Sequence, residues 1–200
     1  MSSRQNPATA QAVTASYWPV PLTRAVVALA VGLAVTFLAD HSPRVGLIAL
    51  GVLGLAGGLV IALLGRGRVS DLTASRMLTG QGALSALIGA ISLTLAFTGA
   101  GLGSLLLLAT LFAVLTGALE LYAGIRTRRT VGREWITVGA GTIVFALVLL
   151  ITPLDSIAVV GFIGAYGIIL GVYLMIAAFS LKWAQGETAA APPPSTGATR

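Results

Sequence analysis

The chain contains no cysteine and only one histidine, His41, among its 200 residues. Without cysteine it can form no disulfide bond, thiolate metal site or cysteine nucleophile, and one histidine cannot build a multi-histidine metal site. Charge is also scarce: Asp, Glu, Lys and Arg make up 9% of the residues, whereas soluble proteins carry about 25%. So little charge cannot cover a water-facing surface, and this excludes an ordinary soluble domain.

Hydrophobic residues make up 56% of the chain, and its mean hydropathy is +0.97. They form charge-poor stretches of about twenty residues, which is the length that a helix needs to cross a hydrocarbon layer about 30 Å thick. We therefore predict an all-α polytopic membrane protein. Its six transmembrane helices are expected at about residues 23–39, 45–64, 77–97, 105–125, 135–151 and 156–181.

An internal repeat links the beginning and the end of this membrane domain. Arg24 is followed eight residues later by Gly32, and Arg133 eight residues later by Gly141. Two prolines are each followed by glycines at offsets of 8, 11 and 14 residues: Pro43 by Gly51, Gly54 and Gly57, and Pro153 by Gly161, Gly164 and Gly167. A repeat of this length is typical of an architecture built from one supersecondary unit.

The unit is a hairpin of two membrane crossings, so we predict three hairpins at 23–64, 77–125 and 135–181. Each hairpin enters and leaves on the same side, which makes the repeats parallel around a pseudo-threefold axis along the membrane normal. The middle copy is degenerate because its turn lacks the proline.

The positive charges predict the orientation. All Lys and Arg residues except Arg44 fall in segments on the side of the N-terminus, and the positive-inside rule places that side, with both termini, in the cytoplasm. The flanking segments 1–22 and 184–200 are expected to be disordered around the membrane domain 23–183. The arginines at helix ends favour contact with the bilayer and its anionic headgroups rather than with nucleic acid.

Glycines recur every three or four residues in the second and sixth predicted helices, which places them in a band on one helix face. Small residues allow close helix packing in lipid, so these glycines are predicted to mediate packing within or between hairpins. The alternative is that the band lines a pore or slides during gating. The glycines concerned are Gly51, Gly54, Gly57, Gly58, Gly161, Gly164, Gly167 and Gly171.

Glu120 is the one ionisable residue that lies well inside a predicted crossing, about 9 Å from the helix end at Arg126 at a rise of about 1.5 Å per residue. An intramembrane carboxylate is costly and is a candidate proton carrier or gate. Two alternatives stay open. Glu120 has a structural role if it reaches water or a loop arginine such as Arg126 or Arg129, and it could also contact another subunit.

Asp40, His41 and Asp155 lie in the predicted outer turns of the first and third hairpins. Protonation of such groups would add positive charge to the outer face as the outside acidifies, which is one way to sense acid. The alternative is that they are solvated turn residues. The sequence contains no nucleophile–base pair, phosphate-binding loop or metal-ligand cluster, so we predict no catalytic residue, cofactor or metal, and no enzyme.

Two segments carry a resemblance to a known family. Gly132–Trp183 (GREWITVGAGTIVFALVLLITPLDSIAVVGFIGAYGIILGVYLMIAAFSLKW) has a leading Gly-Arg and Trp, a proline that ends its first helix and a G-x-x-G…G run in its second. Thr116–Arg129 (TGALELYAGIRTRR) has the glycine–glutamate–arginine ending of a middle repeat. The chain resembles the HdeD-like family of acid-resistance membrane proteins. The resemblance implies six transmembrane helices in a bacterial inner membrane and protection against acid stress, with no established catalytic residues.

The expected function is therefore that of a non-enzymatic integral membrane protein in acid or envelope stress tolerance, with Glu120 as its functionally sensitive residue. A small transporter or channel is the first alternative, although few polar groups or broken helices are available to build a substrate site. A homo-oligomer could still create a pore between subunits. A scaffold that binds another membrane protein through its glycine faces is the second alternative.

Overall fold

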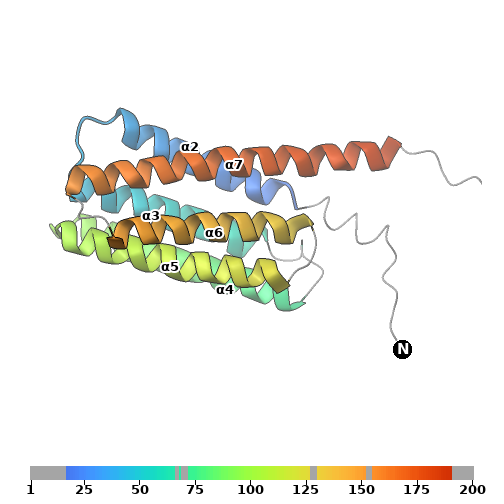
Figure 1. The fold of residues 1–200 in the computed structure, drawn as a ribbon, viewed down its shortest axis with the longest axis horizontal. Coiled ribbons are helices and arrows are strands. Elements are labelled where there is room, and N and C mark those ends of the chain that lie inside the picture. Colours follow the sequence, from blue (N-terminus) through green and yellow to red (C-terminus); the bar gives the residue numbers. More distant parts are fainter. Residues whose placement is uncertain (1–16, 66–67, 69–71, 127–129, 152–154, 191–200) are drawn as a thin grey trace, which may run out of the picture.

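The computed structural model describes residues 17–65, 68, 72–126, 130–151 and 155–190. These residues are helical apart from their turns, and the long helices lie side by side with their axes roughly parallel (Figure 1). The elements are α2 (Pro19–Phe37), α3 (Pro43–Leu59) with the π-helical turn η1 (Val60–Leu64), α4 (Leu72–Ala96), α5 (Leu102–Arg126), α6 (Thr130–Ile151) and α7 (Ser156–Ala190).

Six helices in the described part of the chain are long and apolar enough to cross a membrane, which confirms the six predicted crossings. Their spans are Pro19–Phe37, Pro43–Leu64, Ser75–Ala96, Leu102–Arg126, Gly132–Ile151 and Ser156–Trp183. The protein is thus a multi-pass membrane protein by the length and composition of its helices.

Several helix boundaries differ from the prediction, including the start of α4, which lies at Leu72 and not at residue 77. Helix α2 begins at Pro19, because prolines are tolerated in a first turn, where the backbone N–H groups have no intrahelical partner. Helix α6 begins at Thr130, and α7 continues to Ala190, so residues 184–190 are helical although we expected them to be disordered. Residues 1–16 and 191–200, and Pro153 of the repeat, lie outside the described residues.

The closest helix packing occurs between the predicted hairpins and not within them. The three most extensive interfaces are α2 with α7, α3 with α4, and α5 with α6. Each joins the second helix of one hairpin to the first helix of another, and the last hairpin returns to the first. Helices within a hairpin touch less, and α6 and α7 touch least among the three pairs.

Each of the three interfaces brings two helix backbones together through glycine. A Cβ atom built on Gly89 would lie 2.7 Å from the carbonyl oxygen of Gly51, and one on Gly139 would lie 2.8 Å from that of Gly117. The α2–α7 interface repeats the contact, because a Cβ on Gly32 would lie 2.8 Å from the Gly164 carbonyl oxygen. Real Cβ atoms do not approach this closely, so only glycine permits these contacts.

The spacing of small residues is the same on all six helices, namely seven residues. Two turns of a helix take about seven residues, so both members of each pair lie on one face. The pairs that face each other are Gly51 and Gly58 with Gly82 and Gly89, and Gly117 and Gly124 with Gly132 and Gly139. Between α2 and α7, Gly32 faces Gly164, and Ala25 and Gly171 complete the same spacing on their helices.

Two of the eight glycines that we predicted to mediate packing do not do so. A Cβ on Gly57 or Gly161 would meet nothing within 4 Å, and the same holds for Gly141. The sequence repeat aligned Gly141 with Gly32, but Gly139 occupies the equivalent interface position. Residues two apart lie on nearly opposite faces of a helix, so only one of Gly139 and Gly141 can face α5.

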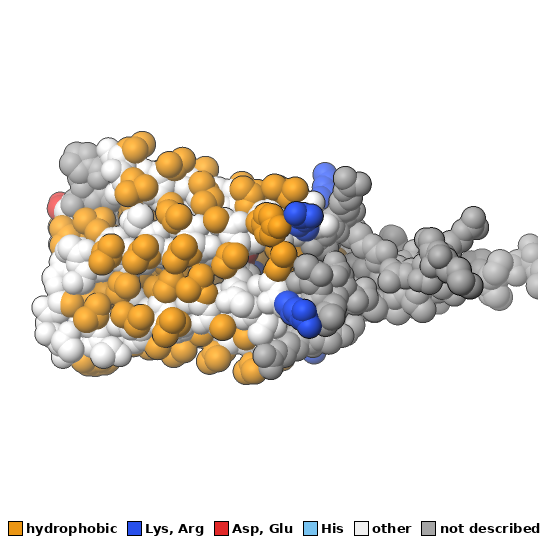
Figure 2. Space-filling model, turned by 90° about the horizontal axis from the view of Figure 1, so that it is seen from below, with side chains coloured by type: hydrophobic (Ala, Val, Ile, Leu, Met, Phe, Trp, Pro, Cys, Tyr) orange, Lys and Arg blue, Asp and Glu red, His pale blue; other side chains and the backbone are white. Residues whose placement is uncertain are grey.

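The surface between the two ends of the bundle is apolar. Large hydrophobic side chains from every helix are exposed, among them Phe37, Leu63, Leu107 and Ile169. Figure 2 shows hydrophobic side chains along one face of the bundle, with Lys and Arg side chains gathered at one end. We call this the arginine-rich end; it is the end at which α2 begins and α7 ends (Figure 1).

Candidate functional site: a buried charge cluster

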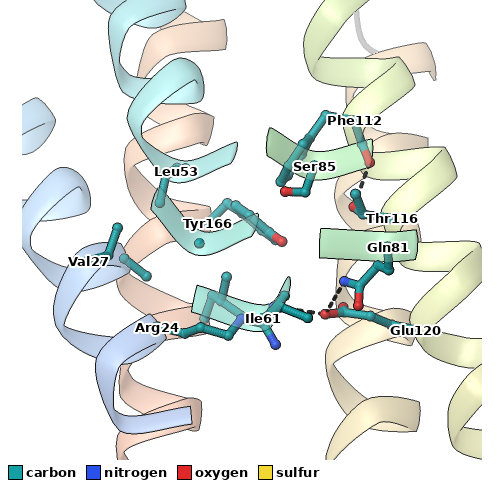
Figure 3. Close-up of a pocket in the computed structure, with 13 residues that line it drawn as sticks. Arg24, Val27, Leu53, Ile61, Gln81, Ser85, Phe112, Thr116, Glu120 and Tyr166 are labelled. Atoms are coloured by element: carbon teal, nitrogen blue, oxygen red, sulfur yellow. Dashed lines mark hydrogen bonds and ion pairs between the residues drawn. The ribbon is translucent and has the colours of Figure 1, made fainter. Parts of the chain in front are cut away.

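A buried ion pair connects three helices near the arginine-rich end. The Arg24 guanidinium of α2 donates from Nη2 to Oε1 of Glu120 on α5 at 2.8 Å. The Gln81 side chain of α4 donates from Nε2 to the same oxygen at 2.7 Å. Figure 3 shows both donors converging on the Glu120 carboxylate. Glu120 is 4% exposed, so this contact is shielded from solvent.

The two charges meet because they lie at the same depth in helices of opposite direction. Arg24 lies five residues after the start of α2 at Pro19, and Glu120 lies six residues before the end of α5 at Arg126. At a rise of about 1.5 Å per residue, both are about 8 to 9 Å from the arginine-rich end. Their charges compensate each other at a depth where an unpaired charge is costly.

The pair changes the interpretation of Glu120. We expected it to be the lone ionisable group inside a crossing, with Arg126 or Arg129 as nearby cations. Arg24 is the cation that contacts it, while Arg126 lies over the Tyr122 ring, 5.3 Å from its centroid. Arg129 lies outside the described residues. The sequence places Arg24 96 residues from Glu120, so only the packing of α2 against the bundle could bring them together.

A small cavity of about 30 Å³ adjoins the ion pair (Figure 3). A water molecule needs about 10 to 15 Å³ of such space, so the cavity has room for about two. Its polar lining consists of Arg24, Gln81, Ser85, Thr116, Glu120 and Tyr166, and its apolar lining consists of Val27, Ala28, Leu53, Gly57, Ile61, Phe112 and Leu170.

The hydroxyl groups around the cavity already have partners. Ser85 donates to the Gly54 carbonyl at 3.0 Å, and Thr116 donates to the Phe112 carbonyl at 2.6 Å. The Tyr166 hydroxyl lies 3.0 Å from the Thr142 hydroxyl. Gly57 faces the cavity without a side chain, which explains why a Cβ there would meet nothing. The cavity is therefore polar on its α4 and α5 side and apolar on its α3 side.

Glu134 is a second buried carboxylate that sequence reasoning missed. It lies on α6, is 5% exposed, and neither of its oxygens has a hydrogen-bond partner among the described residues. It is close enough to Arg24 and Glu120 to interact electrostatically with both. We had predicted that this helix begins at Trp135, which placed Glu134 outside. The Gly132–Gly139 spacing is the signal that would have extended the helix backward.

Trp135 and Tyr17 are buried next to Glu134. Trp135 is 2% exposed and donates from Nε1 to the Tyr17 hydroxyl at 3.0 Å. Their rings meet edge to face, with centroids 6.3 Å apart. Burial raises the pKa of the Tyr17 phenol, so its hydroxyl stays neutral. Trp183 is exposed, as expected for an interfacial aromatic residue.

The titratable residues at the opposite end make local contacts. Asp40 accepts a hydrogen bond from the Ser42 N–H at 2.8 Å, and Asp155 accepts one from the Ala158 N–H at 2.8 Å, at the starts of α3 and α7. The His41 ring nitrogen Nδ1 lies 3.4 Å from the Ala39 carbonyl oxygen. Asp155 precedes α7 directly and satisfies one of its free N–H groups, which is a helix-capping contact.

No group of three or more His, Asp or Glu side chains in the described part of the chain could hold a metal ion. Comparison with models of protein families, with curated proteins and with solved structures gives no match. The six apolar helices identify the chain as a multi-pass membrane protein, and the buried charge cluster of Arg24, Glu120 and Glu134 is its candidate functional site.

Proposed function

We propose that the protein is a non-enzymatic, HdeD-like integral membrane protein of a bacterial plasma membrane that contributes to acid or envelope stress tolerance. In this proposal the charge cluster of Arg24, Glu120 and Glu134 is its proton-responsive part. The supporting observation is the burial of all three ionisable groups inside the helix bundle. Ionisable residues are rare in membrane spans because they are costly there, and those present commonly mark proton relays.

The proposal includes a topology. Both termini lie in the cytoplasm, and the three hairpins are parallel repeats around a pseudo-threefold axis. Support comes from the Lys and Arg side chains at one end of the bundle (Figure 2) and from the three equivalent glycine contacts. The charge cluster then lies near the cytoplasmic side of the membrane.

The cavity argues against transport of a solute larger than water. It has room for about two waters, and the half of the bundle beyond it is filled by apolar residues including Leu47, Leu105 and Ile163. The glycine interfaces argue against a scaffold that binds partners through the predicted glycine faces. Gly51, Gly54 and Gly58 already contact α4, and Gly164, Gly167 and Gly171 already contact α2.

The test is acid survival and internal pH of a strain that lacks the gene, complemented by the wild type or by Glu120→Gln. We expect the wild type to restore control of internal pH after an acid shift and Glu120→Gln to fail, because the amide cannot carry the charge that pairs with Arg24. Arg133→Gln is the control, since this exposed side chain is not part of the cluster and its variant should rescue fully. Equal rescue by Glu120→Gln at equal protein level would refute the role of the cluster.

A further inference from the structure

The unpartnered carboxylate of Glu134 is the feature that the ion pair leaves unexplained. Glu120 has two donors on one oxygen, whereas both oxygens of Glu134 are buried without a partner among the described residues. An ionised carboxylate in that position would lose its hydration without any compensating hydrogen bond. A protonated carboxyl is neutral and avoids that cost, so the geometry favours a proton on Glu134.

The groups that face Glu134 come from three places. Arg24 on α2, Glu120 on α5 and the neutral Tyr17 phenol before α2 are close enough to interact with it electrostatically, although none of them is hydrogen-bonded to it. On α7, Lys182 is exposed at the surface over the Trp18 ring and does not compensate the cluster. One guanidinium therefore serves two carboxylates. It has five N–H donors, and its Nη2 makes the bond to Glu120.

We propose that Glu134 is the proton-binding residue of the membrane domain, and that Arg24 shifts from Glu120 toward Glu134 when that proton leaves. Loss of the proton gives Glu134 a negative charge, which attracts the nearby guanidinium. The proton passes to water at the arginine-rich end, because Glu134 lies only two residues into its span, which begins at Gly132. No other reactant is needed.

The shift would alter the cavity as well as the ion pair. Arg24 and Glu120 both line the cavity, while Glu134 does not. If the guanidinium moved toward α6, Glu120 would keep its hydrogen bond from Gln81 and would accept further hydrogen bonds from water in the cavity. Proton binding at Glu134 would thereby be coupled to the hydration of the bundle interior. Proton binding at Glu134 is argued from the geometry alone, and only its role in acid or envelope stress tolerance rests on the proposed function.

Infrared spectroscopy of the purified protein in lipid tests the inference without reference to any phenotype. Spectra are taken at about pH 6, where solvated Asp and Glu are ionised, and protonated carboxyl groups are counted from their C=O band and its shift in heavy water. We expect one such group in the wild type and none in Glu134→Gln. We also expect none in Glu120→Gln, because Arg24 then pairs with Glu134 and keeps it ionised.

Arg24→Gln should give two protonated carboxyls, since neither glutamate then has a cation. Asp40→Asn is the control and should retain the wild-type band. Glu134→Gln is nearly isosteric and leaves the Arg24–Glu120 pair intact. This variant therefore tests whether the protonated carboxyl is Glu134 even if the arginine variant fails to fold. A wild-type protein without the band, or a band that persists in Glu134→Gln, would overturn the inference. Either result would leave the acid-survival test of the proposed function standing on its own.

Discussion

At the scale of single residues, a polar group buried in the membrane interior is costly unless it has a hydrogen-bond partner. Several hydroxyl groups in the spans find a partner within their own helix: Thr36 donates to the Gly32 carbonyl at 2.8 Å, and Thr142 donates to the Val138 carbonyl at 2.8 Å. A charged group cannot use this solution, because a backbone carbonyl does not neutralise it. Arg24 and Glu120 therefore depend on each other.

This dependence predicts an asymmetric cost of removing one partner. Arg24→Met should destabilise the fold by about 3 kcal/mol, because it leaves Glu120 without its buried cation. Glu120→Gln should cost less, since Arg24 still has Glu134 nearby. The double variant should be more stable than Arg24→Met alone. Unfolding of the purified proteins in mild detergent measures these differences.

Arg133→Gln serves as the control for that series, because the side chain is exposed and its change should stay within about 0.5 kcal/mol. If the costs of Arg24→Met and Glu120→Gln simply added in the double variant, the two side chains would not be coupled and the buried pair would have no energetic role.

At the scale of helices, glycine position decides which surfaces can touch. Glycine lowers helix propensity by about 1 kcal/mol relative to alanine, and in lipid it compensates by allowing close backbone approach. Gly57 and Gly58 are neighbours in α3, but only Gly58 makes a close contact with another helix. A Cβ on Gly58 would lie 2.6 Å from the Ala86 nitrogen, whereas one on Gly57 would enter the cavity.

These neighbouring glycines give opposite predictions. Gly58→Ala should destabilise the protein by about 1 to 3 kcal/mol, because the α3–α4 interface must move apart. Gly57→Ala should be neutral or stabilising by up to about 1 kcal/mol, since it adds helix propensity without a clash. Thermal unfolding in detergent compares the two. A loss of stability in Gly57→Ala as large as that in Gly58→Ala would contradict the assignment of the interface.

At the scale of the whole molecule, the helix pairs close into a cycle. Each hairpin contributes its second helix to one glycine interface and its first helix to another. Each hairpin therefore makes its most extensive helix contacts with the other two hairpins. The shared glycine spacing and the return of α7 to α2 join the three hairpins into one bundle. Charge is sorted along the same axis: the Lys and Arg side chains visible in Figure 2 lie at one end, whereas Arg44 lies in the first turn of α3 at the other.

The proposed orientation can be tested cleanly because the chain has no native cysteine. Single cysteines at exposed Ala39 and Thr98, in the turns after α2 and α4, should react with a membrane-impermeant maleimide added to intact cells. Cysteines at exposed Arg133 and Lys182 should react only after the membrane is opened. The reverse pattern would mean that the arginine-rich end faces outward and that the cluster responds to external pH.

The sequence by itself determined the number and nature of the helices, because hydropathy is a local property of each stretch. The sequence also showed that glycines recur every three or four residues in two of the helices. It singled out Glu120 as well, since a charge within an apolar run can be recognised without knowing its neighbours. The tertiary structure decided which glycines face a partner, with Gly139 chosen over Gly141 by helix rotation. It also decided that Arg24 pairs with Glu120 and that Glu134 has no partner among the described residues. Such contacts join helices far apart in the chain and follow from how the bundle closes, so no local pattern encodes them.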